Sequence, residues 1–127
     1  MNFIDEALEN AGNGNDFVEA MADIFEHDEV RELLGDYPEW VRNIITVIDY
    51  DTELSMEGLD FRSYNEEIIA LRSMGLFSEA DALAPVCAKT SDADIEKCYS
   101  RLALNNDYDA FWQKVYDYAE ENLKKLR

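Results

Sequence analysis

Apolar residues recur every three or four positions along most of the chain, and this spacing predicts helices rather than strands. The clearest case is a helix expected over residues 15–34, in which Phe17, Met21 and Ile24 share one face. The apolar phase slips near His27, which allows a kink or break there. The other expected helices cover residues 3–11, 38–48, 64–74, 78 toward Pro85, 91–104 and 106–127.

The N-terminal starts of helices are indicated by three motifs in which a serine precedes an acidic residue by three positions, the spacing of a capping box. These motifs are Ser63-x-x-Glu66, Ser78-x-x-Asp81 and Ser91-x-x-Asp94. Gly75 is placed to end the helix over residues 64–74 in the left-handed conformation. The expected core is drawn from Phe17, Met21, Ile24, Trp40, Ile44, Ile48, Leu71, Trp112 and Tyr116.

The composition agrees with a helical fold. The 127 residues correspond to about one domain, 47% of them are apolar, and only 5 Gly and 2 Pro are present. We therefore expect a single all-α domain over residues 1–127, a bundle of six or seven helices. The chain shows no signal-peptide pattern and no long apolar run, so we expect a cytoplasmic protein without membrane contact. Cys87 and Cys98 are expected to be reduced, buried thiols.

Charge is distributed very unevenly. The first 60 residues contain 17 acidic residues against Arg31 and Arg42, a formal charge of −15, whereas the remainder carries −3. So negative a segment excludes direct binding of nucleic acid or anionic membranes, because phosphate ligands need basic contacts. It favours a basic protein, a cationic toxin or metal ions as the partner. The alternative is an acidic surface that only keeps the protein soluble.

Five acidic residues of residues 16–29 recur every three or four positions and should form one stripe on the expected helix. Helical rise would place successive members roughly 4.5–6 Å apart along the axis, loosely comparable to nucleic-acid phosphates. Like charges at this spacing repel, so stability alone does not explain a stripe without interleaved lysines. We predict a partner-binding surface made of Asp16, Glu19, Asp23, Glu26, Glu29, Glu32, Asp36 and Glu39.

A calcium site is a weaker alternative. Five acidic residues align with positions 1, 3, 5, 9 and 12 of a calcium-loop template, namely Asp49, Asp51, Glu53, Glu57 and Asp60. Leu54 stands where the loop needs glycine, and Asp60 stands where it needs a bidentate glutamate. The structural state of residues 49–60 stays open.

Catalytic chemistry finds little support in the residues. His27 is the only histidine and lies in an acidic run, and the chain has no glycine-rich phosphate loop and no His/Cys cluster. We expect no catalytic residues, no metal site, no cofactor and no enzyme.

The middle and end of the chain resemble a known family. Glu53–Leu59, with the sequence ELSMEGL, is similar to the E-V-N-N-G-G-F segment of the bacterial DNA-mimic protein family, which are small acidic all-α proteins. Further similar segments are Tyr64, Glu66–Leu71, Met74-Gly75, Ala80–Leu83, Asp107–Asp109 and Phe111–Tyr118. The resemblance covers roughly residues 45–122 and leaves out the strongly acidic residues 1–45. Its family-motif positions are Glu53, Gly58, Leu59 and Gly75.

The resemblance implies a dimer whose carboxylates imitate DNA phosphates and occupy a DNA-binding protein. We therefore expect a DNA mimic that binds a basic protein such as a transcription regulator. One alternative is an immunity or antitoxin-like inhibitor of a cationic toxin. The other is a calcium-responsive helical module that uses Asp49–Asp60.

Overall fold

A computed structural model of the chain describes residues 1–103 and 106–127. All regular elements in this part of the chain are helical, which confirms the all-α class. The total number of helices is slightly above the expected six or seven, because residues 22–36 form separate 3₁₀ segments. The elements are α1 (Phe3–Asn10), α2 (Gly14–Met21), η1 (Ala22–Phe25), η2 (Asp28–Asp36), α3 (Glu39–Met56), α4 (Asn65–Ser73), α5 (Phe77–Leu83), α6 (Asp92–Tyr99) and α7 (Tyr108–Leu126), where η denotes a 3₁₀ helix.

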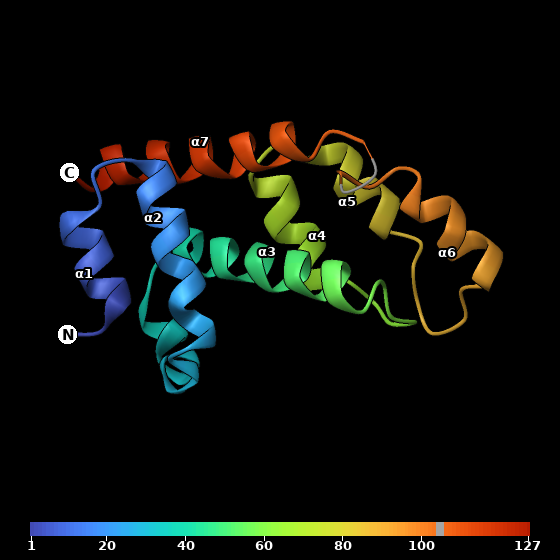
Figure 1. The fold of residues 1–127 in the computed structure, drawn as a ribbon, viewed down its shortest axis with the longest axis horizontal. Coiled ribbons are helices and arrows are strands. Elements are labelled where there is room, and N and C mark those ends of the chain that lie inside the picture. Colours follow the sequence, from blue (N-terminus) through green and yellow to red (C-terminus); the bar gives the residue numbers. More distant parts are fainter. Residues whose placement is uncertain (104–105) are drawn as a thin grey trace.

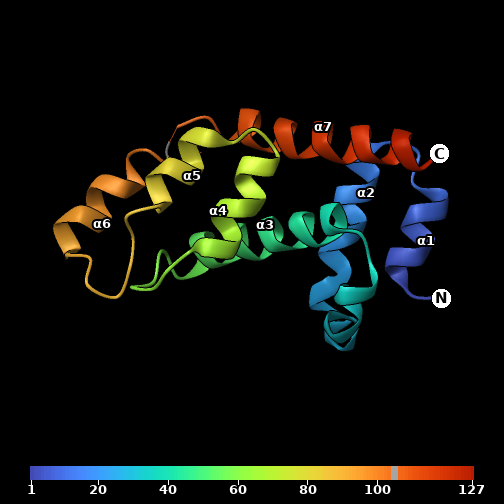
Figure 2. The same ribbon diagram turned by 180° about the vertical axis from the view of Figure 1, so that it is seen from behind.

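The two longest helices, α3 and α7, run along the long axis of the molecule (Figure 1). At one end α2 crosses and packs against both of them, and α1 covers α2. In the other half, α4 packs on α3 and leads to α5, and α6 lies at the far tip (Figure 2). Both termini therefore lie at the end that holds α1 and α2.

The core contains most of the predicted residues. Ile44, at the centre of α3, is fully buried, as are Phe17, Met21, Ile24 and Leu71. Trp40, Trp112 and Tyr116 were also predicted for the core, but each is only half-buried and packs against its edge. Helical spacing places a side chain on the inward face, but it does not say whether a neighbouring element covers the ring.

Gly14 sets the distance between α2 and α7. A Cβ on Gly14 would lie 2.7 Å from the backbone nitrogen of Glu120 and closer still to the backbone oxygen of Tyr116. The Gly14 N–H donates to the Glu120 carboxylate at 3.0 Å. The start of α2 is thus held close against the backbone of α7.

The serine caps were predicted with mixed success. Ser91 caps α6, since its hydroxyl accepts from the Asp94 N–H at 3.2 Å. The predictions for Ser63 and Ser78 are wrong, because α4 and α5 begin after Tyr64 and Leu76 without a side-chain cap. Tyr64 is fully buried, so core packing rather than a serine fixes where α4 starts.

Two further boundaries differ from prediction. The last helix is capped by Asp107, as expected, and α3 continues eight residues past Ile48, to Met56. The helix that Ser91 caps ends at Tyr99, and its predicted end at Leu104 lies outside the described residues. Of the two cysteines predicted to be buried, Cys98 is buried, but Cys87 is exposed in the turn after α5.

A buried carboxylate ties the far half of the molecule together. Glu79 on α5 is only 5% exposed. Its Oε1 accepts from the Tyr50 hydroxyl of α3 at 2.5 Å, and its Oε2 accepts from the Ala103 N–H at 2.8 Å. Burial raises the pKa of Glu79 above its ordinary value, and the hydrogen bonds from Tyr50 and Ala103 offset part of that rise.

Candidate protein-binding site

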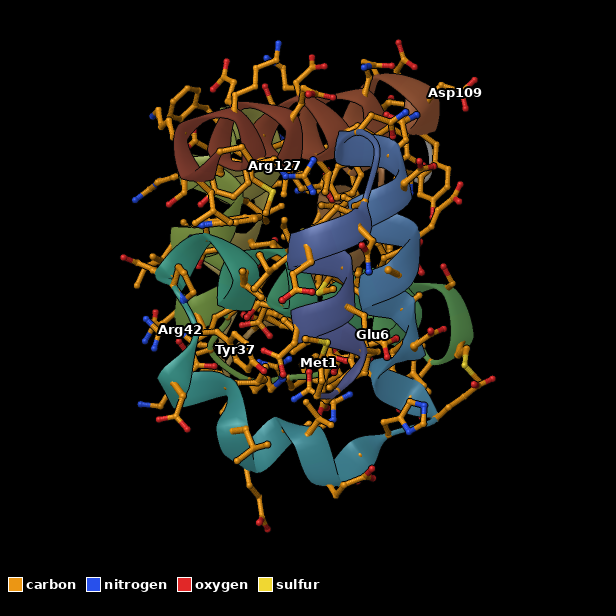
Figure 3. The ribbon with its side chains drawn as sticks, turned by 90° about the vertical axis from the view of Figure 1, so that its left-hand side faces the viewer. Met1, Glu6, Tyr37, Arg42, Asp109 and Arg127 are labelled. Atoms are coloured by element: carbon orange, nitrogen blue, oxygen red, sulfur yellow. The ribbon has the colours of Figure 1, made fainter. Side chains whose placement is uncertain are left out.

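The eight carboxylates predicted to bind a partner are all exposed. They lie on α2, η1, the turn after η1, η2 and the first turn of α3, toward the end of the molecule that Figure 3 shows, where η2 crosses below α1 and α2. We call this set the acidic surface: Asp16, Glu19, Asp23, Glu26, Glu29, Glu32, Asp36 and Glu39.

The acidic surface does not form the single straight stripe that was predicted. The α-helix ends at Met21, η1 adds one tight segment, and the chain turns at His27, whose φ and ψ are −129° and 57°. The reason is the phase slip: Ile24 and Val30 are both buried, but six positions do not return to the same face of an α-helix. The carboxylates therefore follow two arms, one on α2 and η1 and the other on η2 and the start of α3.

Arg31 holds the second arm to the body of the protein. Its guanidinium donates to both oxygens of Asp49 on α3, at 2.7 and 2.9 Å, and to Asp28 at 2.7 Å. These bonds, the one to Asp49 first, raise the pKa of Arg31 above its ordinary value. The only Lys or Arg in the first 40 residues is thus used to position η2 and does not neutralise the acidic surface.

The end of η2 is anchored to α1. The Tyr37 hydroxyl donates to Asp5 at 2.8 Å and accepts from the Asn2 side-chain amide at 2.9 Å. Asn2 and Asp5 form the capping box of α1, a start signal that sequence inspection missed. Partial burial, followed by the bond to Asp5, raises the pKa of Tyr37.

The eight carboxylates have almost no cationic neighbours. None forms an ion pair with a Lys or Arg in the described part of the chain. The nearest approach is His27 Nδ1, which lies 3.7 Å from Glu29 and can attract it only when protonated. His27 is half exposed and stacks on Phe3, which agrees with its predicted place at the surface.

Sequence inspection did not anticipate a groove beside the acidic surface. It lies between α2, α3 and α7 and has a volume of about 420 Å³. We call it the aromatic groove, and its defining residues are Phe25, Tyr108, Trp112, Tyr116, Glu19 and Asp51. The signal in the sequence was the spacing of Tyr108, Trp112 and Tyr116, one helical turn apart on α7.

Asp51 and Tyr108 form a polar pair in this groove. The Tyr108 hydroxyl donates to Asp51 Oδ1 at 2.5 Å. Burial raises the pKa of Asp51, and the bond from Tyr108 opposes that rise. Burial and the same bond raise the pKa of Tyr108 to about 12, so the hydroxyl keeps its proton at neutral pH.

The calcium-loop alignment is wrong as a structural description, because residues 49–56 belong to α3 and do not form a loop. The first three aligned carboxylates also have separate partners: Asp49 binds Arg31, Asp51 binds Tyr108, and Glu53 binds Arg62. No group of three or more potential metal ligands occurs among the described residues.

The family-motif residues make contacts that shape turns and hold helices together. Gly58 ends α3 with φ +77°, and a side chain there would collide with the Tyr99 hydroxyl. The same hydroxyl accepts from the N–H of buried Leu59 at 2.6 Å. Gly75 has φ +81°, as predicted, and Glu53 pairs with Arg62 at 3.0 Å. Gly58 and Leu59 thus lie in the turn after α3, Glu53 lies within α3, and Gly75 lies in the turn after α4; none of them belongs to the acidic surface.

Comparison of the chain with protein-family models, curated proteins and solved structures found no match. No helix in the described part of the chain is long and apolar enough to cross a bilayer.

Proposed function

We propose that this chain is an acidic protein-binding protein, and that it acts as a DNA mimic on the DNA-binding surface of a basic protein such as a transcription regulator. One observation carries the proposal. Eight exposed carboxylates follow consecutive segments, and within the described chain none is paired with a Lys or Arg.

The energetics support a role outside the fold. Exposed like charges at close spacing repel, at a few tenths of a kcal/mol per pair on a helix. Lysines and arginines of a partner would remove this repulsion. No existing ion pair with a Lys or Arg of the described chain would have to break first, because the eight carboxylates form none. Such binding is steered at long range and weakens as salt screens it over about 8–10 Å.

The bent course of the two arms favours a second candidate. A DNA strand presents its phosphates along one continuous line, whereas these carboxylates turn at His27. A surface with such a corner also suits an immunity or antitoxin-like protein that blocks a cationic toxin by shape and charge together. Both candidates use the same carboxylates, and they differ in whether DNA competes for the partner.

The experiment is capture of a partner from the source lysate on immobilised protein at low salt, followed by elution at high salt. The purified partner is then bound again in the presence of duplex DNA. We expect DNA to displace the chain from its partner. A partner that does not bind DNA and stays bound supports the toxin-inhibitor candidate instead.

A charge-reversal variant tests whether the acidic surface makes the contact. We expect the triple variant Glu26→Lys, Glu29→Lys and Glu32→Lys to lose the partner and stay folded, because surface changes usually cost within about 0.5 kcal/mol each. The matched control reverses three exposed glutamates elsewhere, Glu57, Glu96 and Glu121. Equal binding by the two triple variants would leave the acidic surface with only a solubilising role.

A further inference from the structure

The aromatic groove combines ring faces with carboxylates; Arg31 approaches the ring of Phe25, but it is not among the described residues that line the groove. Four aromatic side chains and two carboxylates line it, and no Lys or Arg is among its described lining residues. Phe25 is 49% exposed at its edge, although a phenylalanine ring is better buried than left in water. Glu19 belongs to both the groove and the acidic surface, so the two regions are continuous.

At two places in the fold, one of them at a wall of the groove itself, an arginine completes the same combination. The Arg62 guanidinium lies 3.9 Å from the ring centroid of Tyr64 while it pairs with Glu53 and Glu67. Arg31 lies 5.7 Å from the centroid of Phe25 while it pairs with Asp49 and Asp28. In both places a planar cation rests near an aromatic face with carboxylates at its edge.

Asp51 is prepared to accept a further donor. Its Oδ1 accepts from Tyr108, and its Oδ2 accepts no hydrogen bond from the described residues. No polar side-chain atom of the described residues is both buried and without a partner, so Oδ2 must remain within reach of solvent. A guanidinium in the groove could donate to Oδ2 and stack on an aromatic ring at the same time.

Resting on the proposed function, we propose that the aromatic groove is the anchor site for an arginine side chain of the basic partner. Charge complementarity selects a cation, because Glu19 and Asp51 line the groove and neither pairs with a Lys or Arg of the described chain; Arg31, which approaches Phe25, is paired with Asp28 and Asp49. The aromatic walls favour arginine over lysine, since the flat guanidinium is weakly hydrated and stacks on rings while donating in its plane. The acidic surface then attracts the partner, and the groove fixes its position.

The test uses two blocked hexapeptides of equal charge, one with two arginines and one with two lysines, titrated into the full chain labelled with ¹⁵N. The chain has two tryptophans, which give separate indole N–H signals. Trp112 lies in the groove, whereas Trp40 packs on Phe17 at 5.0 Å between ring centroids. We expect the arginine peptide to shift the Trp112 signal saturably and to bind about 5–10-fold more tightly than the lysine peptide.

Two variants with matched controls locate the preference. Phe25→Leu and Asp51→Asn should bring the arginine-to-lysine affinity ratio close to one. Phe77→Leu removes another exposed ring, on α5 (60% exposed, against 49% for Phe25), and Asp92→Asn removes a carboxylate on the distant α6, so both should keep the ratio. Thermal unfolding and the amide spectrum of each variant show whether the fold is intact.

The outcomes separate this inference from the proposed function. Equal affinities for the two peptides, or a Trp112 signal that does not move, would overturn the anchor site. Binding that perturbs only η2 amides would do the same and leave the acidic surface as the contact. The proposed function fails on a different result, a partner that binds equally to the two triple charge-reversal variants.

Discussion

Glu79 and the acidic surface hold the same chemical group in opposite surroundings. Glu79 is buried, and each of its oxygens accepts a hydrogen bond from a different segment of the chain. The eight carboxylates of the acidic surface are exposed and have no Lys or Arg partner among the described residues. The fold thus supplies two hydrogen-bond donors to buried Glu79, whereas it supplies no Lys or Arg partner to the eight exposed carboxylates of the acidic surface.

The arginines follow the same division. Arg31 and Arg62 each bind two carboxylates. Arg31 joins η2 to α3 through Asp49, and Arg62 joins the end of α3 to the start of α4 through Glu53 and Glu67. Such pairs are worth little at a fully exposed site, but bidentate, partly buried arginine contacts also fix geometry. Arg31 and Arg62 therefore serve the architecture, and neither pairs with a carboxylate of the acidic surface.

The largest expected effect separates the two kinds of carboxylate by stability. Glu79→Ala should lower the free energy of unfolding by about 2–4 kcal/mol, because it leaves the Tyr50 hydroxyl and the Ala103 N–H without an acceptor. Glu29→Ala, on the acidic surface, should change it by no more than about 0.5 kcal/mol. Urea unfolding followed by circular dichroism measures both.

If the two alanine variants lost the same stability, the contrast between the two regions would be mistaken. A large loss in Glu29→Ala would mean that η2 depends on its carboxylates, and the acidic surface would then be part of the fold. A negligible loss in Glu79→Ala would mean that water replaces the buried carboxylate at no cost.

A smaller effect is expected where the acidic surface is attached to the body. Arg31→Met should lower the free energy of unfolding by about 1 kcal/mol, since it removes a bidentate pair that remains partly exposed. Hydrogen exchange should quicken in η2 and stay unchanged in α5. Arg42→Met is the matched control, because Arg42 forms no ion pair with the described residues. Unchanged exchange in η2 would show that Val30 and Tyr37 hold this segment without Arg31.

Helical periodicity was enough to predict the class of the fold and to choose core residues most of which are buried. Phe17, Met21 and Ile24 keep regular spacing within a short stretch and pack as expected. What could not be predicted depends on contacts between distant residues. A kink or break near His27 was predicted from the phase slip, and the chain does turn there. The path of the chain after the turn depends on burying Val30 and on pairing Arg31 with Asp49, and neither contact is visible in local spacing.

The site shows the same limit. Exposure of the eight carboxylates was predictable, because unpaired acidic side chains are rarely buried. Their arrangement on two arms was not, since it depends on where the chain leads after the turn at His27. The aromatic groove was missed for a related reason: Asp51 was matched to a calcium loop, whereas helix α3 places it beside Tyr108 of α7.

The smallest expected effect is the pH dependence that Glu79 adds to stability. Burial raises the pKa of Glu79 above its value in the unfolded chain, so between these two values the folded protein binds more protons than the unfolded one. The free energy of unfolding contributed by this group is then complete below the unfolded pKa and is lost as pH rises through the folded pKa. Acidification from pH 7 toward pH 5 should therefore stabilise the wild type.

Repulsion within the acidic surface acts in the same direction, so a variant is needed to isolate the buried group. Glu79→Gln keeps the shape and cannot titrate; its amide oxygen can still accept from the Ala103 N–H, while its amide nitrogen would donate to the Tyr50 hydroxyl oxygen. The stability gained between pH 7 and pH 5 should be greater in the wild type than in Glu79→Gln, measured by urea unfolding at each pH. If the two gains were equal, Glu79 would titrate as an ordinary exposed carboxyl despite its burial, and the pH dependence would come from other groups, such as Asp51, whose pKa burial also raises.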